Sequence, residues 1–340
     1  MKSKLFFRAD GNEKIGLGHI VRCLSIIQMV HDYFDCVMIV NNADKSILNI
    51  INEVCLFIDI EAKDPTKEIE KIRGIVQKTD IFIFDGYVFD LAYQIELKKI
   101  VNKLVAIDDL SGKEFNVDVI INHGDISVLP SYQTLIQTQI FSGFDYLIVR
   151  PDFIKASILK KNVISINTVF VCMGGADPYN ITTKVIKACS QCDFIQKIII
   201  IIGSVYHNKF ELKSLLAKIN NVSIELIENA TSTQMVNCIS RSQIAISTSS
   251  TISLEICCVK SALISGTVVD NQNAIHSLLM NNGCCISVGD WKKKSIPDIK
   301  TAISSLNDTV TVQKIIDAQT RCIDGSSSNR ILNIFKNLAA

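Results

Sequence analysis

A histidine in a glycine-rich turn offers the most clearly defined chemistry in this 340-residue chain. Gly16 and Gly18 stand in the turn and His19 follows directly, where a predicted strand at 5–8 gives way to a predicted helix. Glycines let a ligand approach the main chain closely, and N–H groups at a helix start attract an anion. His19 is therefore a candidate catalytic residue, because an imidazole there could act on a bound substrate. The alternative is an ordinary strand-to-helix turn with an incidental histidine.

Carboxylates follow two later strands of the first half. Asp85 and Tyr87 come at the end of the fourth predicted strand, and Asp108 and Asp109 follow the fifth. Two adjacent aspartates suggest a metal site, but neighbours in sequence point in different directions and no third ligand is evident. We therefore predict no metal. One aspartate is expected to cap the following turn, and the other to face the ligand.

A pair of glycines opens the second half. Gly174 and Gly175 follow a predicted strand and form a turn suited to an anion, while Asp177 and Pro178 have the residue types of a helix N-cap and first helical residue. The turn lacks the G-K-[ST] ending of a Walker loop and the G-x-G-x-x-G of a dinucleotide loop. These absences argue against kinases and nicotinamide dehydrogenases.

Four consecutive hydroxyl residues, at 248–251, follow another predicted strand of the second half. Their side chains and N–H groups can bond to phosphate oxygens, which makes Ser249 and Ser250 candidate phosphate contacts. Glu255, about one turn further on, is placed to accept from a ribose diol. The alternative is a capping box that serves only the helix. Asn271 adds an amide at the same sheet edge.

Arg150 lies at the junction of the two halves. An arginine there could clamp a phosphate or carboxylate through two hydrogen bonds. The alternative is an ion pair that holds the linker.

Short β-branched or aromatic runs alternate with longer amphipathic stretches, which indicates repeated β-α units. Several strands are nearly continuous apolar runs, as parallel strands buried on both faces are. The predicted strands are 5–8, 36–40, 56–60, 81–85, 104–107 and 117–121, then 168–173, 197–203, 223–227, 244–247, 262–264 and 285–288. The pattern predicts an α/β protein with two Rossmann-like β/α domains facing a cleft, where ligands bind at the strands' carboxyl ends. We place an N-terminal catalytic domain at 1–155, a C-terminal nucleotide-binding domain at 163–326, and a last helix at 327–340 docking on either domain.

Composition excludes several classes of protein. Hydrophobic residues make up 48% and charged residues 20%, which excludes general disorder, and a net charge of +1 gives no reason to expect a nucleic-acid partner. No apolar run reaches the roughly 20 residues that span a bilayer, and the N-terminal run is too short for a signal peptide. The 12 cysteines stand mostly in apolar surroundings, which favours a reducing, cytoplasmic location.

Taken together, these motifs resemble the nucleotide-sugar hydrolases of bacterial pseudaminic acid biosynthesis. Those enzymes share the glycosyltransferase-B fold with the UDP-GlcNAc transferase of peptidoglycan synthesis. The matching segments are 7–10, 15–24, 85–87, 107–110, 118–122, 146–153, 174–178 with Asn180 and Thr182, 249–250 with Glu255, and 270–272. They cover most of the chain in the same order, and the segment from Arg8 to Arg22 is the most specific of them.

The resemblance implies hydrolysis of a UDP-linked diacetamido-trideoxy sugar to UDP and free sugar, with inversion and without metal or cofactor. His19 matches the catalytic base, which would take a proton from the attacking water. Arg22 would help the diphosphate or only support the turn. The implied substrate-binding residues are Gly16, Gly18, Arg22, Tyr87, Asp108, Arg150, Gly174, Gly175, Ser249, Ser250, Glu255 and Asn271. Gly86 departs from the pattern, because a more polar residue is common there.

Two other functions fit the same residues. A glycosyltransferase would pass the sugar from UDP to an unknown acceptor instead of water, since fold does not fix function. A non-catalytic subunit of a membrane-associated complex would bind the nucleotide sugar without turnover. The oligomeric state cannot be predicted from the sequence.

Overall fold

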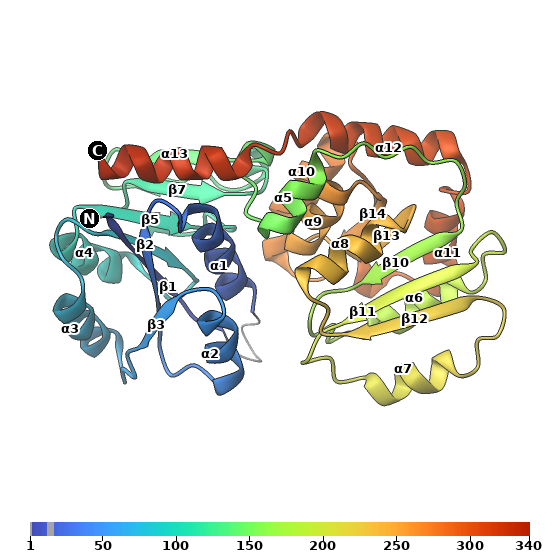
Figure 1. Ribbon diagram of the computed structural model, residues 1–340, viewed down its shortest axis with the longest axis horizontal. Helices are drawn as coiled ribbons and strands as arrows, with labels where there is room; N and C mark the ends of the chain where they lie inside the picture. Colours follow the sequence, from blue (N-terminus) through green and yellow to red (C-terminus); the bar gives the residue numbers. More distant parts are fainter. Residues whose placement is uncertain (1, 12–16) are drawn as a thin grey trace. The chain divides into compact units, whose positions relative to one another are not determined.

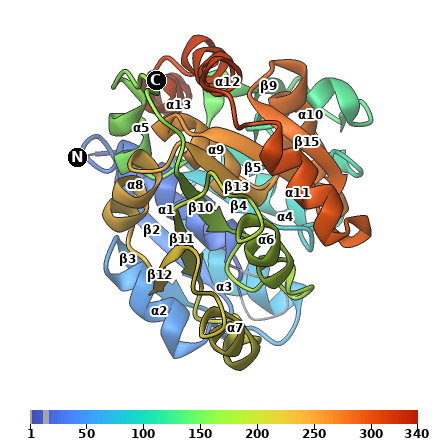
Figure 2. The same cartoon turned by 90° about the vertical axis from the view of Figure 1, so that its right-hand side faces the viewer.

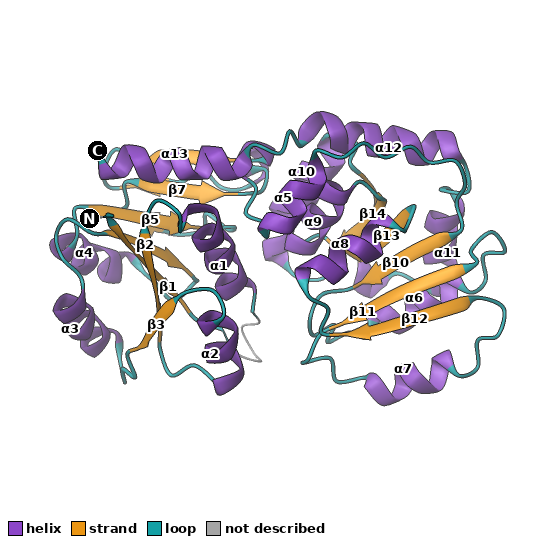
Figure 3. Ribbon diagram, in the orientation of Figure 1, coloured by secondary structure: helices purple, strands orange, loops and turns teal. Residues whose placement is uncertain are grey.

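The computed structural model describes residues 2–11 and 17–340. By its internal contacts the chain divides into two units (Figure 1). Unit 1 comprises Met1–Pro151 and Ser326–Ala340, and unit 2 comprises Asp152–Gly325. Strands and helices alternate along each unit, as Figure 3 shows. The predicted α/β class with two parallel-sheet domains is therefore confirmed.

Unit 1 contains a 7-stranded parallel sheet in the order β3-β2-β1-β4-β5-β7-β9. Its strands are β1 (Lys4–Ala9), β2 (Asp35–Val40), β3 (Leu56–Asp59), β4 (Ile81–Asp85), β5 (Lys103–Ile107), β7 (Val119–Asn122) and β9 (Gln139–Ser142). Its helices are α1 (Gly18–Val30), α2 (Lys45–Asn52), α3 (Pro65–Ile75), α4 (Leu91–Ile100) and α13 (Ser327–Ala339). A short pair, β6 (Glu114–Phe115) and β8 (Gln133–Thr134), and the 3₁₀ turns η1 (Ile126–Val128) and η2 (Phe144–Tyr146) complete the unit.

Helices cover both faces of this sheet. Alternate strand residues such as Phe7 and Ile83 pack against α1, α2 and α13 on one face, and Phe6 and Phe82 pack against α3 and α4 on the other. Figure 1 shows α13 alongside β7. The apolar residues of α1 recur at helical spacing, so this helix is fixed against the sheet and its first turn has a defined place at the sheet's edge.

Unit 2 contains a 6-stranded parallel sheet in the order β12-β11-β10-β13-β14-β15. Its strands are β10 (Thr168–Cys172), β11 (Lys197–Ile202), β12 (Ser223–Glu228), β13 (Ile244–Thr248), β14 (Ala262–Thr267) and β15 (Cys285–Asp290). Its helices are α5 (Pro151–Ser157), α6 (Ile181–Cys189), α7 (Lys209–Leu216), α8 (Ser232–Ser240), α9 (Thr251–Val259), α10 (Asn273–Asn281), α11 (Ile296–Ser304) and α12 (Thr309–Cys322). The 3₁₀ turns η3 (Asp270–Gln272) and η4 (Trp291–Lys293) follow β14 and β15.

The core of unit 2 is a set of buried isoleucines and valines from β10, β11 and β13, joined by apolar residues of α6, α11 and α12. Figure 2 shows α6 beside α11, and the two helices pack against each other. α9 packs on β13 and β14, and α10 on β14 and β15. The turns that precede α6, α9 and α10 all follow strands of this sheet, so each begins at the sheet's carboxyl edge.

The structure contains elements that were not predicted. The strands β6, β8 and β9 and the helices α11 and α12 were not expected, and α5 begins at Pro151, where a linker was expected. In the residues that the structure describes, no helix is long and apolar enough to cross a membrane.

Candidate functional site

The carboxyl edge of the sheet in unit 1 gathers the polar residues that could do chemistry. β1, β4, β5 and β7 are neighbours and run parallel, with Arg8 level with Phe84, and Ile107 level with Ile121. Residues that follow these strands therefore meet at one edge. His19, from the first turn of α1, lies with them and is buried.

His19 is paired with the last residue of β4. Its Nδ1 lies 2.6 Å from Oδ1 of Asp85, a carboxylate that is fully buried. An ionised carboxylate only accepts hydrogen bonds, so we assign the ring proton to Nδ1, which donates to Asp85. A terminal nitrogen of Arg22 also lies 2.8 Å from Nδ1, but that nitrogen already donates to the same carboxylate oxygen over 2.7 Å. Nε2 is then the basic nitrogen of a neutral ring, and within the described residues no hydrogen bond engages it. This pair leaves an oriented imidazole that is able to accept a proton.

Arg22 holds Asp85 from the other side. Its Nε and one terminal nitrogen donate to the two oxygens of Asp85 over 2.8 and 2.7 Å, and its other terminal nitrogen donates to Oδ2 of Asp109 over 2.6 Å. Burial opposes ionisation of Asp85, but Arg22 and His19 outweigh it and hold the pKa of this carboxyl below its ordinary value. Arg22 stands one turn after His19 on α1, so both residues reach the same carboxylate.

The cluster around His19 contains more carboxylates than guanidinium groups. Asp85 and Asp109 are two carboxylates against the single guanidinium of Arg22. The arrangement can support general-base chemistry at His19.

Tyr87 lies over this cluster and is 44% exposed. Its hydroxyl donates to Oδ1 of Asp109 over 2.9 Å, and its ring meets His19 edge-on with centroids 4.9 Å apart. The departure at Gly86 has a structural cause. The backbone there has a φ of +153°, and a Cβ would lie 2.9 Å from the ring of Phe89, so a side chain does not fit.

The two adjacent aspartates make different contacts, and one of them closes the following turn, as predicted. Asp108 closes the turn, because its Oδ2 accepts from the N–H groups of Leu110 and Ser111 at 3.1 and 2.7 Å and from the hydroxyl of Tyr132 at 2.9 Å. Burial raises the pKa of Asp108, and these hydrogen bonds offset part of that rise. Asp109, which was not among the predicted substrate-binding residues, is the one that joins Arg22 and Tyr87.

His123 is a second histidine at this edge, one residue beyond β7, and the sequence analysis did not identify it. Only 1% of its surface is exposed, and neither ring nitrogen makes a hydrogen bond of good geometry to any described residue. The pKa of His123 is lowered to about 4, chiefly by burial and also by Arg22, although Asp109, Asp85 and the nearby Ile148 backbone favour the charged ring. His123 is thus a neutral imidazole among charged neighbours.

A second buried network supports the end of β1. Arg8 donates to Glu68 over 2.8 Å and to both oxygens of Asp10 over 2.5 and 2.8 Å, and Tyr93 donates to Glu68. Asp10 in turn accepts from the N–H of Asn41 over 3.1 Å. These bonds fix the last described residues of β1 before the glycine turn.

The turn before the helix α6 in unit 2 differs from the prediction for Asp177 and Pro178. The helix begins at Ile181, not at Pro178, because Asp177 and Asn180 have left-handed backbone with φ of +38° and +50°. The Asp177 carboxylate still caps the helix, since it accepts from the N–H groups of Ile181 and Thr182 at 2.9 and 2.7 Å. Gly174 has a φ of +91°, which favours glycine.

The residues of the hydroxyl turn of unit 2, at 248–251, differ in how exposed they are. Ser249 is fully buried, whereas Ser250, the N-cap of α9, is half-buried. Ser250 makes no side-chain capping bond, so the capping-box alternative is wrong for this residue. Glu255 is buried within α9.

The remaining predicted residues are placed as follows. Asn271 lies half-buried in η3, and Arg150 lies half-buried directly before α5. Gly18 is the first residue of α1, and a Cβ there would meet nothing within 4 Å, so the protein's own packing does not require glycine. Gly16 lies outside the described residues.

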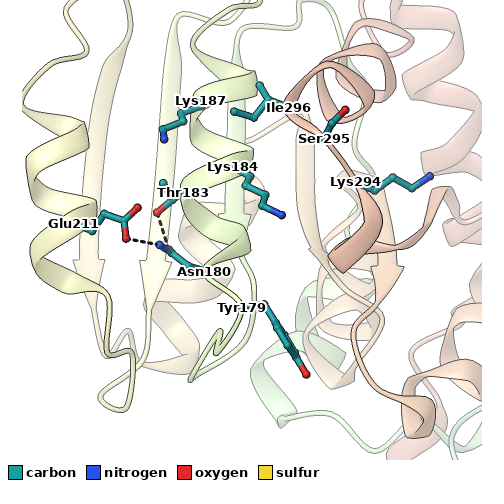
Figure 4. Close-up of a pocket in the computed structure, with 9 residues that line it drawn as sticks. All are labelled: Tyr179, Asn180, Thr183, Lys184, Lys187, Glu211, Lys294, Ser295 and Ile296. Carbon is teal, nitrogen blue, oxygen red and sulfur yellow. Dashed lines mark hydrogen bonds between the residues drawn. The ribbon is translucent and has the colours of Figure 1, made fainter.

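A hollow of about 520 Å³ lies on unit 2 beside α6 (Figure 4). Lys184, Lys187 and Lys294 line it, and on one side Asn180 donates to Glu211 over 2.9 Å. None of the predicted substrate-binding residues lines this hollow.

The structure thus brings together three predicted residues of unit 1, namely His19, Arg22 and Tyr87. It adds Asp85 and Asp109 as their partners and His123 as a neighbour. Asp85 and Asp109 could be singled out in the sequence by their positions at the ends of strands. For His123 the sequence offered only its position after a short apolar strand. Among the described residues, no group of three or more His, Cys, Asp and Glu side chains is arranged to hold a metal ion.

Comparison of the sequence with curated proteins finds three relatives at 23% identity, and no protein-family model matches the chain. An uncharacterized protein of Methanocaldococcus jannaschii matches over 63% of the chain, which spans about half (46%) of that relative's length. The UDP-2,4-diacetamido-2,4,6-trideoxy-beta-L-altropyranose hydrolase of Campylobacter jejuni matches over 82% of the chain and 97% of its own length. The spore coat polysaccharide biosynthesis protein SpsG of Bacillus subtilis matches over 83% and 82%.

Solved structures match almost the whole chain at low identity. MurG of Acinetobacter baumannii superposes with a TM-score of 0.69 at 9% identity, over 98% of this chain and 99% of its own. The MnaA–UDP structure from S. aureus superposes with a TM-score of 0.64 at 13% identity, over 99% and 98%. The chain therefore has the glycosyltransferase-B fold, and its sequence resembles the hydrolase of Campylobacter jejuni.

Proposed function

We propose that this protein hydrolyses a UDP-linked diacetamido-trideoxy sugar to UDP and free sugar, in the biosynthesis of pseudaminic acid. The observation that carries the proposal is the His19–Asp85 pair, which leaves Nε2 of a neutral imidazole ready to accept a proton. The resemblance to the hydrolase of Campylobacter jejuni over 82% of the chain supports the choice of substrate.

In the proposed reaction, the oxygen of a water molecule attacks the anomeric carbon of the sugar. Its proton passes to Nε2 of His19, and the bond between that carbon and the phosphate oxygen breaks, with the electron pair leaving on UDP. Attack comes from the face opposite the leaving group, so the configuration inverts. Asp85 stabilises the imidazolium that forms, and Arg22 keeps Asp85 ionised and in place.

UDP is assigned to unit 2 in this proposal. The turn at Gly174 and Gly175 and the hydroxyl turn at Ser250 are strand-to-helix turns at the carboxyl edge of a parallel sheet, where N–H groups favour an anion. Glu255 and Asn271 belong to the segments that follow β13 and β14 at the same edge. The chemistry needs no metal or cofactor, because His19 activates the water directly.

The reaction is tested with the purified protein and the UDP-sugar in H₂¹⁸O, without any acceptor and with excess EDTA. The proposal predicts that UDP and free sugar appear together, with the inverted anomer first in the NMR time course. The label should enter the sugar and not the UDP, because the carbon–oxygen bond breaks. Label in UDP, or a requirement for added metal, would contradict the proposed chemistry.

A glycosyltransferase is the second candidate, and its support is the fold shared with MurG. It predicts no free sugar in the same experiment, and transfer of the sugar to an acceptor once one is added. A binding subunit without catalytic activity predicts UDP binding and no turnover with any UDP-sugar.

All 12 cysteines are free thiols, which supports a reducing compartment such as the cytoplasm as the site of the reaction.

A further inference from the structure

Unit 2 contains a histidine in a hydrogen-bonded chain that the proposed reaction does not use. Three serines lie in one row across neighbouring strands, because Ser247 of β13 is level with Ser265 of β14, and Ser265 with Ser287 of β15. Ser249, just after β13, and His276, on α10, connect this row.

The contacts in this chain are short. Oγ of Ser249 lies 2.8 Å from Oγ of Ser265 and 2.7 Å from Nδ1 of His276. Nε2 of His276 lies 2.9 Å from Oγ of Ser287. At its two ends, Ser265 donates to the carbonyl of Ser247 over 3.2 Å, and Ser287 accepts from the N–H of Gly289 over 3.1 Å.

We assign the protons by the one order of donors and acceptors that satisfies all five contacts together. Ser265 gives its only hydroxyl proton to a carbonyl, so it accepts from Ser249. Ser249 has then used its own proton and must accept from Nδ1–H of His276. In a neutral ring Nε2 is then the acceptor and receives the proton of Ser287.

This order of hydrogen bonds requires a neutral His276 ring. A proton on Nε2 would make Ser287 the acceptor in that contact and would leave the hydroxyl proton of Ser287 without its partner. Burial lowers the pKa of His276 below its ordinary value, which keeps the ring neutral near pH 7.

This hydrogen-bonded chain passes through Ser249, in the hydroxyl turn. The N–H of Ser249 donates to the carbonyl of Gly266 over 2.8 Å, so its backbone and its side chain are both engaged. Ser250 follows, and its N–H donates to the carbonyl of Thr248 over 2.9 Å. Ser250 and Thr251 are half-buried and open α9, so they are the members of the turn that a ligand can reach.

We propose that His276 is a positioning residue for nucleotide binding. It anchors Ser249 so that Ser250 presents its hydroxyl, and Thr251 its hydroxyl and N–H, to the diphosphate. In this proposal Ser249 supports the turn from beneath and does not contact the phosphate. The inference rests on the proposed function, because it takes the hydroxyl turn as the diphosphate site.

The first test measures the tautomer of His276 directly. Long-range ¹H–¹⁵N NMR spectra of the protein, with His276→Gln used for assignment, should show Nδ1 protonated and Nε2 unprotonated. A ring with its proton on Nε2 would overturn the proton order derived above. This test needs no ligand, so its result is independent of the proposed function.

The second test compares two substitutions of His276 by calorimetric titration with UDP. His276→Leu removes both hydrogen bonds, and we expect the Kd for UDP to rise roughly tenfold, as one lost hydrogen bond predicts. His276→Gln offers one donor and one acceptor, so it should retain most of the affinity. His31→Leu, an exposed histidine of unit 1, is the matched control and should bind UDP as the unmodified protein does.

Steady-state kinetics distinguish a positioning role of His276 from a purely structural one. If His276 positions the nucleotide, His276→Leu should raise KM and leave kcat within about twofold, because no reacting group has moved. Ser287→Ala removes the far end of the chain and should weaken UDP binding by a smaller factor, which keeps the test decisive if His276→Leu does not fold. Unchanged UDP affinity in a folded His276→Leu and in Ser287→Ala would overturn the inference. No UDP binding by the unmodified protein would instead overturn the proposed function.

Discussion

Nδ1 of His19 lies 2.6 Å from Oδ1 of Asp85, a fully buried carboxylate that ends β4. The two residues are 66 positions apart in the chain, and the parallel pairing of β1 with β4 brings them to one edge. Because Arg22 binds both oxygens of the same carboxylate, Asp85 cannot turn away from the imidazole without losing two charged hydrogen bonds. The tautomer of His19 is therefore set by residues buried beneath it.

Replacing Asp85 tests the importance of that tautomer. In Asp85→Asn the amide can donate to Nδ1, which moves the ring proton to Nε2 and removes the base. We expect kcat to fall by about a hundredfold or more, while the Kd for UDP, measured by titration calorimetry, stays close to its original value. A variant that keeps full turnover would show that Asp85 does not control His19.

Arg22→Lys tests whether both carboxylates need the planar guanidinium. A lysine cannot hold Asp85 through two bonds and Asp109 at the same time, so one buried carboxylate loses its partner. We expect the free energy of unfolding in urea to fall by about 3 kcal/mol. Arg73→Lys is the matched control, because that arginine is 60% exposed and 3.7 Å from Glu96, and it should change stability by less than about 0.5 kcal/mol. Equal effects of the two substitutions would contradict this account.

His123 predicts a specific acid sensitivity. Its pKa is about 4 in the folded protein against an ordinary 6.5, so the unfolded chain binds a proton between these values and the folded protein does not. Stability is therefore highest above pH 6.5 and declines as the pH falls toward 4, by about 3 kcal/mol from this group. His123→Leu should flatten that decline in thermal unfolding at pH 7 and pH 5, whereas the exposed His31→Leu should not. An unchanged pH dependence in His123→Leu would show that folding does not lower the pKa of this ring.

The two glycines before α6 should respond differently to substitution. Gly174 has a φ of +91°, so Gly174→Ala should lower the free energy of unfolding by about 1–2 kcal/mol. A Cβ at Gly175 would meet nothing within 4 Å, so Gly175→Ala should fold with nearly unchanged stability. If the diphosphate approaches this backbone, Gly175→Ala should instead weaken UDP binding in calorimetry. Unchanged affinity would remove Gly175 from the diphosphate site.

The alternation of apolar strands and amphipathic helices was sufficient to predict the fold class, because buried parallel strands such as β4 and β11 have an apolar side chain at almost every position. β9 was not predicted because it is an edge strand whose residues are exposed or half-buried. α12 was not predicted because it begins with β-branched residues, which favour strands in isolation. Its packing against α9 and β14 overrides that local preference.

The candidate site could be predicted only in part. His19 and Arg22 were visible in the sequence because a glycine turn and helical spacing mark them. The choice between Asp108 and Asp109 depends on which carboxylate faces Arg22, and that direction is set by the turn at Leu110 and Ser111. His276 was not predicted because its partners lie on two strands and a turn that no local pattern connects.

The most direct test of the central claim compares His19→Asn with the unmodified protein, with His31→Asn as the control. Turnover of the UDP-sugar at saturation and the Kd for UDP are measured for all three. The account predicts that His19→Asn loses about 10²- to 10⁴-fold in kcat, the range for a lost general base, and binds UDP with nearly unchanged affinity. Full turnover by His19→Asn would contradict the assignment of His19 as the catalytic base.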